Sequence, residues 1–172
     1  MDTGLLILRL VVGLVLAGHG AQKLFGLFGG YGIAGTGGWL DSIGFRPGRP
    51  MAVLVGLAEL AGGLGLALGL LTPLSAAVVI GTMAVAVWTH SSNGLWSTSG
   101  GYELPLINAV AAAALAFTGA GSISLDNALG LTFGTDYGVA AVVVGLVAAL
   151  AAVTRAKLAL RSTSTEQVLA EA

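Results

Sequence analysis

Five long apolar runs constrain the fold of this chain more than any other feature of its sequence. They extend over about residues 4–28, 51–71, 74–90, 102–118 and 137–154. Each run approaches the roughly 17–25 residues that an α-helix needs to cross the hydrocarbon core of a bilayer. The third and fourth runs lie at the short end of that range. We therefore expect an all-α protein, a polytopic membrane helical bundle.

The composition agrees with a membrane environment. Apolar residues make up 56% of the chain and charged residues only 9%, whereas about a quarter of the residues in a soluble domain are charged. The net charge of −1 and the lack of a basic stripe give no reason to expect a nucleic-acid partner. The chain has no cysteine, so disulfides and thiolate metal sites are excluded. The composition therefore predicts the lipid bilayer as the partner of this chain.

Two connections between the runs are informative. Thr72 and Pro73 separate the second run from the third, and they suit the N-cap and the first position of a helix, so we expect a tight helical hairpin. The longest connection, residues 29–50, is rich in glycine and contains Gly30-x-Gly32-x-x-Gly35. A dinucleotide-binding fingerprint requires a preceding strand, whereas these glycines follow a membrane helix. We interpret the connection as a tight interfacial loop that could also re-enter the bilayer.

Basic residues predict the orientation of the chain. If all five runs cross the membrane, six of the seven basic residues fall on one side and only Arg9 lies near the other. The six are Lys23, Arg46, Arg49, Arg155, Lys157 and Arg161. An excess of Lys and Arg marks the cytoplasmic face. We therefore expect a protein integral to the cytoplasmic (plasma) membrane, with its N-terminus outside and its C-terminus in the cytoplasm.

Small residues recur on the first two apolar runs and predict a close helix–helix contact. Gly13, Ala17 and Ala21 recur every four residues on the first run, and the second carries a similar stripe. Small side chains let membrane helices approach closely. The stripe on the second run consists of Ala58, Gly62, Gly65 and Gly69.

Polar residues gather in one half of the predicted bundle. An ionised side chain at the centre of a membrane helix costs roughly 2.5–3.5 kcal/mol and normally faces the protein interior. Glu59 lies roughly 12 Å from the start of its helix, at a depth similar to that of His19 on the preceding antiparallel helix. Arg9 is the exception, about 15 Å from His19. The other members of this half are Gln22, Lys23, His90, Tyr102 and Glu103. We expect these residues to converge on one cavity.

Each of these residues also has a purely structural explanation. His19 could be a packed core histidine, and Lys23 could extend its ammonium group to the membrane surface. Glu103 could be a carboxylate that the helix dipole favours in a first turn. Glu59 could form a structural ion pair with Arg9, His19 or Lys23. Arg9 could instead reach the outer interface through its long stem.

The cluster favours proton exchange or the binding of a polar headgroup. No HExxH or ExxH spacing is present, so we assign no metal ligands. A quinone carbonyl takes up a proton when it is reduced, and a histidine or a protonated glutamate can donate that proton. We predict His19 and Glu59 as catalytic residues. The predicted quinone-binding residues are Arg9, Gln22, Lys23, His90, Tyr102 and Glu103.

Several segments of the sequence resemble the DoxX family of small bacterial integral membrane proteins. They are RLVVGLVLAGHGAQKLFG (residues 9–26), GLAELAGGLGLALGLLT (56–72), His90, GGYELPL (100–106) and, where the likeness fades, SLD (124–126). The resemblance covers about three-quarters of the chain. It implies a four-helix membrane bundle associated with respiratory or redox complexes. Relatives include quinone-reducing subunits of thiosulfate:quinone oxidoreductases. The family's polar motif positions correspond to Arg9, His19, Lys23, Glu59, His90 and Glu103.

We accordingly expect three segments. Residues 1–130 form a DoxX-like four-helix core, 131–161 form a fifth transmembrane helix with a basic flank, and 162–172 form a short polar tail. The resemblance implies a membrane subunit of a redox system that binds quinone and acts with membrane or soluble redox partner proteins. No motif encodes a cofactor with its own redox chemistry, and the sequence is compatible with a homo-oligomer. Two alternatives stay open: a non-catalytic accessory or scaffold protein, and a conduit for protons or small solutes.

Overall fold

The computed structural model describes residues 2–170, and the side chains through residue 162. Every regular element in the described residues is helical. The long helices are α1 (Asp2–Phe25), α3 (Gly48–Leu68), α4 (Thr72–His90), α5 (Glu103–Thr118) and α7 (Thr135–Ala170). The short elements are η1 (Leu27–Gly29), α2 (Gly32–Ser42), η2 (Ser91–Asn93), η3 (Ser97–Ser99) and α6 (Leu125–Ala128). The predicted all-α fold is confirmed.

Each of the five apolar runs coincides with one long helix. Four segments of the described chain are long and apolar enough to cross a membrane: Asp2–Phe25, Gly48–Leu68, Thr72–Asn93 and Thr135–Ser162. The fifth helix, α5, has only 16 residues and extends roughly 24 Å, less than the thickness of a typical hydrocarbon core. Helix α7 continues through most of the predicted polar tail to Ala170, and residues 171–172 lie outside the described residues.

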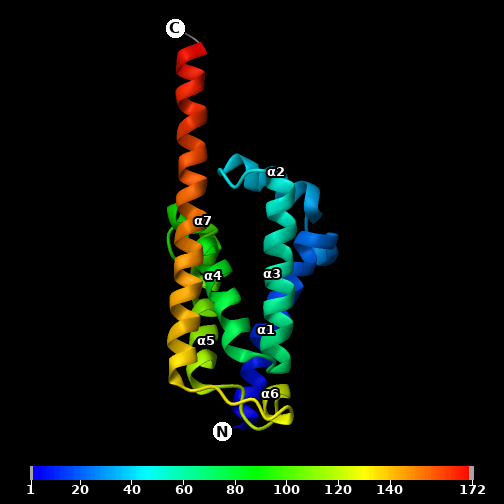
Figure 1. The fold of residues 1–172 in the computed structure, drawn as a ribbon. Helices are drawn as coiled ribbons and strands as arrows, with labels where there is room; N and C mark the ends of the chain where they lie inside the picture. The colour runs from blue at the N-terminus through cyan, green and yellow to red at the C-terminus, as the bar shows by residue number, and fades with distance from the viewer. Residues whose placement is uncertain (1, 171–172) are drawn as a thin grey trace.

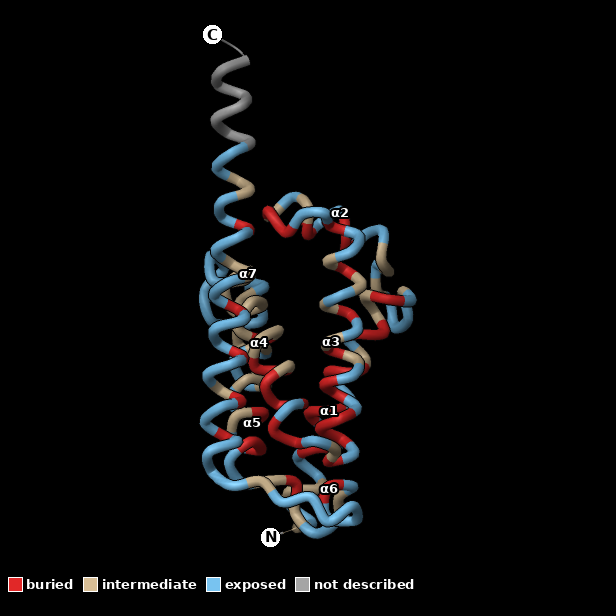
Figure 2. The backbone as a smooth tube through the Cα atoms, in the orientation of Figure 1, coloured by how far each residue is buried: buried red, intermediate tan, exposed pale blue. Residues whose placement is uncertain are grey.

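The helices form two packed groups that are joined at one end. Helix α1 packs mainly on α3, whereas α7 packs on α4 and α5. The short α3–α4 connection joins the groups, and the two helices diverge from it toward the end that carries α2 (Figure 1). Buried residues lie on the facing sides of α1, α3 and α4, while much of α7 is exposed (Figure 2). Because apolar side chains cover this exposed surface, lipid must be its solvent.

Close contact between α1 and α3 depends on glycine. A Cβ atom at Gly20 would lie 2.5 Å from the amide nitrogen of Leu60, and one at Gly63 would lie 2.5 Å from the carbonyl oxygen of Gly13. The predicted role of Gly13 and Ala17 in a close helix contact is therefore confirmed. The predicted stripe on α3 does not form a single contact face. Gly62 and Gly65 face Ser75 of α4, while Gly69 ends α3 with a φ of +63°.

The connection between α1 and α3 is not a simple loop. It contains the eleven-residue helix α2, which lies across the α3 end of the bundle (Figure 1). Four glycines lower the helix propensity of this segment, and Thr36, Gly37 and Leu40 are its buried residues. The loop after α2 reaches α7, because Gly44 lies against the carbonyl group of Ala156. The segment therefore bridges the two helix groups.

The turn before α4 is stabilised by a distant carboxylate. Thr72 is the first residue of α4, and it does not cap the helix as expected; its hydroxyl donates to Asp126 Oδ2 over 2.6 Å. The same carboxylate accepts the backbone N–H groups of Leu71 (2.6 Å) and Thr72 (3.0 Å). Asp126 thus performs the capping that the sequence assigned to Thr72, because an ionised acceptor satisfies helix N–H groups more strongly than a hydroxyl.

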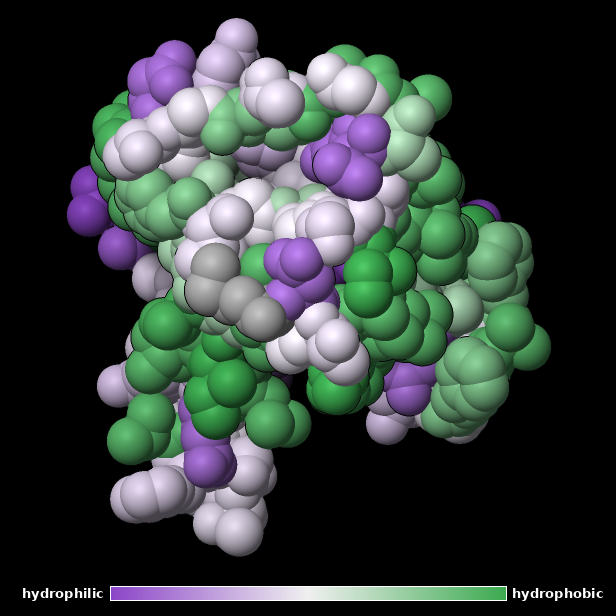
Figure 3. Space-filling model, turned by 90° about the horizontal axis from the view of Figure 1, so that it is seen from below, coloured by the Kyte–Doolittle hydropathy of each residue, from purple (hydrophilic) through white to green (hydrophobic). Residues whose placement is uncertain are grey.

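Arg9 lies in the same end of the molecule and is fully buried. Its Nη2 donates to the carbonyl oxygen of Ile123, and its Nη1 occupies the space where a side chain at residue 69 would stand. Arg9 thus extends toward this end of the bundle, as the long-stem alternative allowed, but it is buried there under the 119–131 segment. From the N-terminal end, weakly polar and hydrophilic residues gather near the middle of the face and hydrophobic residues lie around its sides (Figure 3).

Candidate functional site

A polar pocket lies at the α2 end of the bundle, between α1, α2 and the end of α4. Its volume is about 540 Å³. The lining residues are Gln22, Lys23, Gly29, Gly30, Tyr31, Gly35, Thr36, Trp39 and His90. Three of them are residues that the sequence predicted for ligand binding. The pocket thus combines aromatic walls with an amide, an ammonium group and an imidazole.

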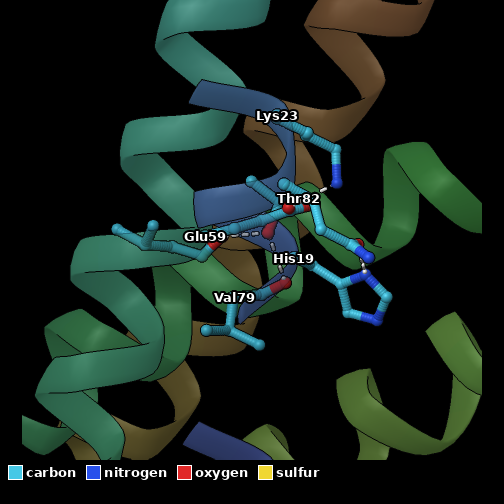
Figure 4. Close-up of polar contacts among 7 residues, drawn as sticks. His19, Lys23, Glu59, Val79 and Thr82 are labelled. Carbon is cyan, nitrogen blue, oxygen red and sulfur yellow. Dashed lines mark hydrogen bonds and ion pairs between the residues drawn. The ribbon is translucent and has the colours of Figure 1, made fainter. Parts of the chain in front are cut away.

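An ion pair joins α1 to α3 beside this pocket. Lys23 Nζ lies 2.5 Å from Glu59 Oε2. The lysine side chain is 25% exposed and the glutamate side chain 4% exposed, so the carboxylate lies behind the ammonium group that lines the pocket (Figure 4). Of the three partners considered for Glu59, the structure selects Lys23. A charge buried in this way is tolerated because its partner satisfies it.

His19 and Gln22 form a second polar contact on the same side of α1. His19 Nδ1 donates to Gln22 Oε1 over 2.9 Å, and Gln22 Nε2 donates to the carbonyl oxygen of Phe28 over 3.1 Å. Both His19 and Lys23 project from this side of the helix (Figure 4). His19 is exposed and does not line the pocket, since it lies roughly one helical turn below Lys23. The alternative that His19 is a packed core histidine therefore does not hold.

His90 closes the pocket from α4. Its ring stacks on Trp39 of α2, with ring centroids 6.3 Å apart and an angle of 24° between the planes. Its Nδ1 donates to the carbonyl oxygen of Gly100 over 3.1 Å. This bond fixes the ring orientation and leaves Nε2 as the nitrogen available to a ligand.

Tyr102 and Glu103 stabilise the loop that follows α4 instead of lining the pocket. Glu103 Oε2 accepts the backbone N–H of Ser97 over 3.0 Å and its hydroxyl over 2.9 Å. The backbone N–H of Tyr102 donates to Gly94. Arg9 lies at the opposite end of α1. The structure therefore brings Gln22, Lys23, Glu59 and His90 together, places His19 just below them, and leaves Arg9, Tyr102 and Glu103 outside the pocket.

Sequence reasoning did not anticipate the part that α2 plays. Tyr31, Thr36 and Trp39 line the pocket, but the glycines around them suggested an interfacial loop. The role of Asp126 in capping the start of α4 was also not predicted. The signal for Asp126 was a lone carboxylate after Ser124, whose hydroxyl accepts the Asn127 N–H as an N-cap. Within the described residues, His, Asp and Glu side chains form no group of three that could hold a metal ion.

These features define a class: a small polytopic helical membrane protein with a polar pocket at one end of the bundle. Residues 4–92 match the DoxX family, described as DoxX. Because this match extends over more than half of the chain, the protein belongs to the DoxX family. The match begins inside α1 and ends inside η2, before α5, whereas the resemblance in the sequence extended to Asp126. No curated protein and no solved structure matches the chain at a significant level.

Proposed function

We propose that this DoxX-family membrane protein binds the headgroup of a quinone in the polar pocket, as a membrane subunit of a redox system. The observation that carries the proposal is the placement of Lys23, an ammonium group that lines the pocket while the buried Glu59 carboxylate holds it from behind. Trp39 and Tyr31 supply flat apolar surface for a ring. Pockets with apolar walls and a few polar groups are typical of small-molecule sites.

The chemistry assigned to the pocket is proton delivery. Reduction of a quinone to its quinol consumes two electrons and two protons. The electrons would come from a reduced membrane or soluble redox partner protein, because the chain has no cysteine and carries no recognisable redox-cofactor motif. Lys23 would donate a hydrogen bond to one carbonyl oxygen, and the Nε2 atom of His90 would donate to the other when the imidazole ring carries both protons, because Nδ1–H is engaged by Gly100. Such bonds strengthen as negative charge develops on these oxygens during reduction.

His19 and Glu59 have supporting roles in this proposal. Glu59 holds and can exchange a proton with the Lys23 ammonium group, whereas His19 touches Gln22 and could pass protons toward the pocket. Arg9, Tyr102 and Glu103 contribute through the fold. We further propose that residues 1–130 form the functional core and that the helix after residue 131 supports it.

The test is quinone binding by the purified protein in mild detergent. Wild-type protein should retain or titrate a quinone, and Lys23→Gln should weaken binding about 10–100-fold, because a hydrogen bond from a charged donor is lost. Lys157→Gln is the matched control, since it removes a cation from the same end of the molecule without touching the pocket. Dissociation constants from tryptophan quenching by the quinone provide the measurement.

Two results would count against the proposal. One is a wild-type protein with no bound and no titratable quinone. The other is equal affinity in Lys23→Gln and Lys157→Gln when both variants retain the wild-type melting temperature. Either result would favour the reading of the protein as a non-catalytic accessory subunit.

A further inference from the structure

A second cavity, lined by apolar residues and one threonine, lies between the two helix groups. Its volume is about 350 Å³. Leu40 and Phe45 form its roof. The α3 wall consists of Met51, Leu54, Val55 and Ala58; the α4 wall of Leu74, Ala77, Val78, Gly81, Thr82 and Val85; and the α7 wall of Val144, Gly145, Ala148, Ala149 and Ala152. It shares no lining residue with the polar pocket.

The shape and chemistry of this cavity suit a hydrocarbon chain. Its lining residues on α4 run from Leu74 to Val85, a rise of roughly 16 Å. Thr82 is the one polar side chain among the lining residues, and its hydroxyl donates to the carbonyl oxygens of Val78 and Val79 on its own helix. The cavity therefore offers no free side-chain hydrogen-bonding group to a polar ligand.

Cationic groups stand above the roof of the cavity. Arg155 follows the lining residue Ala152 by three residues on α7, and its Nη2 donates to the carbonyl oxygen of Arg46 over 3.2 Å. Lys157 Nζ lies 5.6 Å from the ring centroid of Trp88. Among the described side chains of this region Asp41 is acidic, and its Oδ1 accepts the Gly48 N–H over 2.7 Å.

We propose that the cavity binds one acyl chain of an anionic glycerophospholipid, with the lipid phosphate at Arg155. The apolar walls accommodate the chain, and a guanidinium group is the side chain best suited to a phosphate. The charge lies beside the roof, at one end of the cavity. One lipid molecule can therefore place its acyl chain between the apolar walls and its phosphate at the cationic end. Binding of this lipid would brace α3 against α7 without involving the polar pocket.

The test uses Trp88, whose ring contacts Phe45 in the cavity roof with centroids 6.0 Å apart. Protein carrying Trp39→Phe and Trp96→Phe is placed in phosphatidylcholine vesicles that contain a brominated phospholipid, and bromine on an acyl chain in the cavity quenches Trp88 fluorescence. Brominated phosphatidylglycerol should reach half-maximal quenching at a mole fraction about fivefold lower, for each cation engaged, than brominated phosphatidylcholine.

Two pairs of variants separate the chain from the headgroup. Ala148→Phe fills the cavity and should abolish saturable quenching, whereas Val147→Phe, on the exposed side of α7, should preserve it. Arg155→Gln should reduce the preference for phosphatidylglycerol about fivefold, whereas Arg161→Gln, roughly 9 Å further along α7, should retain it. Equal quenching by the two lipids in the wild-type protein would overturn the proposal. So would unchanged quenching in Ala148→Phe, because the lipid would then bind only at the surface.

Discussion

Asp126 shows how one buried side chain can organise an entire end of a membrane bundle. Its carboxylate accepts three hydrogen bonds from the start of α4, and its own N–H donates to Gly69 at the end of α3. Arg9 lies against Gly69 and binds Ile123, three residues before Asp126. A turn between two helices is thus fixed by residues more than fifty positions away in the chain.

Asp126→Asn should therefore destabilise the protein. The amide group keeps one acceptor oxygen but loses the charge that favours a helix N-terminus, so we expect a loss of about 2 kcal/mol in the free energy of unfolding. Asp136→Asn is the control, because this carboxylate lies in the first turn of α7 and is exposed; it should change stability by less than about 0.5 kcal/mol. Denaturant unfolding in detergent micelles measures both. Equal losses would contradict the role of Asp126.

The polar site could be predicted from the sequence only in part. Helical spacing and depth placed Glu59 near the end of α1 and allowed Lys23 as its partner. They did not separate Lys23 from His19, because the two residues share one helical face and differ by a single turn. For Glu103, the position in the sequence suggested that it joins the polar cluster. In the structure its carboxylate instead accepts hydrogen bonds from the nearby Ser97. Local hydrogen bonds of this kind are not visible in spacing.

At the scale of elements, the α1–α3 contact leaves no room for a side chain at its central glycines. Gly20 faces α3 so closely that a methyl group would lie 2.6 Å from the carbonyl oxygen of Gly56, whereas a methyl group at Gly18 would meet nothing within 4 Å. Of these two glycines in one turn of α1, Gly20 therefore has no room for a side chain, whereas Gly18 does. Sequence spacing identified the helix as small-residue rich, but only the structure separates these positions.

Gly20→Ala and Gly18→Ala form a matched pair for this contact. Gly20→Ala should force the helices apart and lower the free energy of unfolding by about 1–3 kcal/mol. Gly18→Ala should leave stability unchanged or raise it by up to about 1 kcal/mol, because alanine has the higher helix propensity. Thermal melting in one detergent compares them directly. A similar melting temperature for both variants would show that α1 and α3 do not pack as described.

Helix α2 is the element that the sequence concealed. Its glycines have low helix propensity, and on propensity alone this segment is predicted to be a loop. Tertiary contacts compensate for that low propensity: Leu40 is buried in a cluster with Phe45, Ala52 and Ala156. Because these partners come from three separate parts of the chain, no local pattern could have predicted them.

For the whole molecule, the alternation of helices leads to a prediction of orientation. The elements that carry Lys23, Arg46, Arg49, Arg155, Lys157 and Arg161 meet at the α2 end, and the α6–α7 connection lies at the other end (Figure 1). We predict that the α2 end faces the cytoplasm. The chain has no cysteine, so single cysteines can report on each end.

Thr98→Cys and Thr132→Cys make this comparison with two exposed threonines. Thr98 lies in the connection after α4, and Thr132 lies just before α7. In intact cells a membrane-impermeant maleimide should label Thr132→Cys and spare Thr98→Cys until the membrane is permeabilised. The reverse pattern would mean that the chain inserts with its basic end outward, against the charge rule.

The bridge from Gly44 to Ala156 links the portion of the chain that matches the family to a helix beyond it. Residues of α7 supply one complete wall of the apolar cavity. Without α7, that flank of α4 would be open to the bulk bilayer and the guanidinium group of residue 155 would be absent. Retention of a particular lipid would then depend on a helix beyond the family match, separately from whatever chemistry the polar pocket performs.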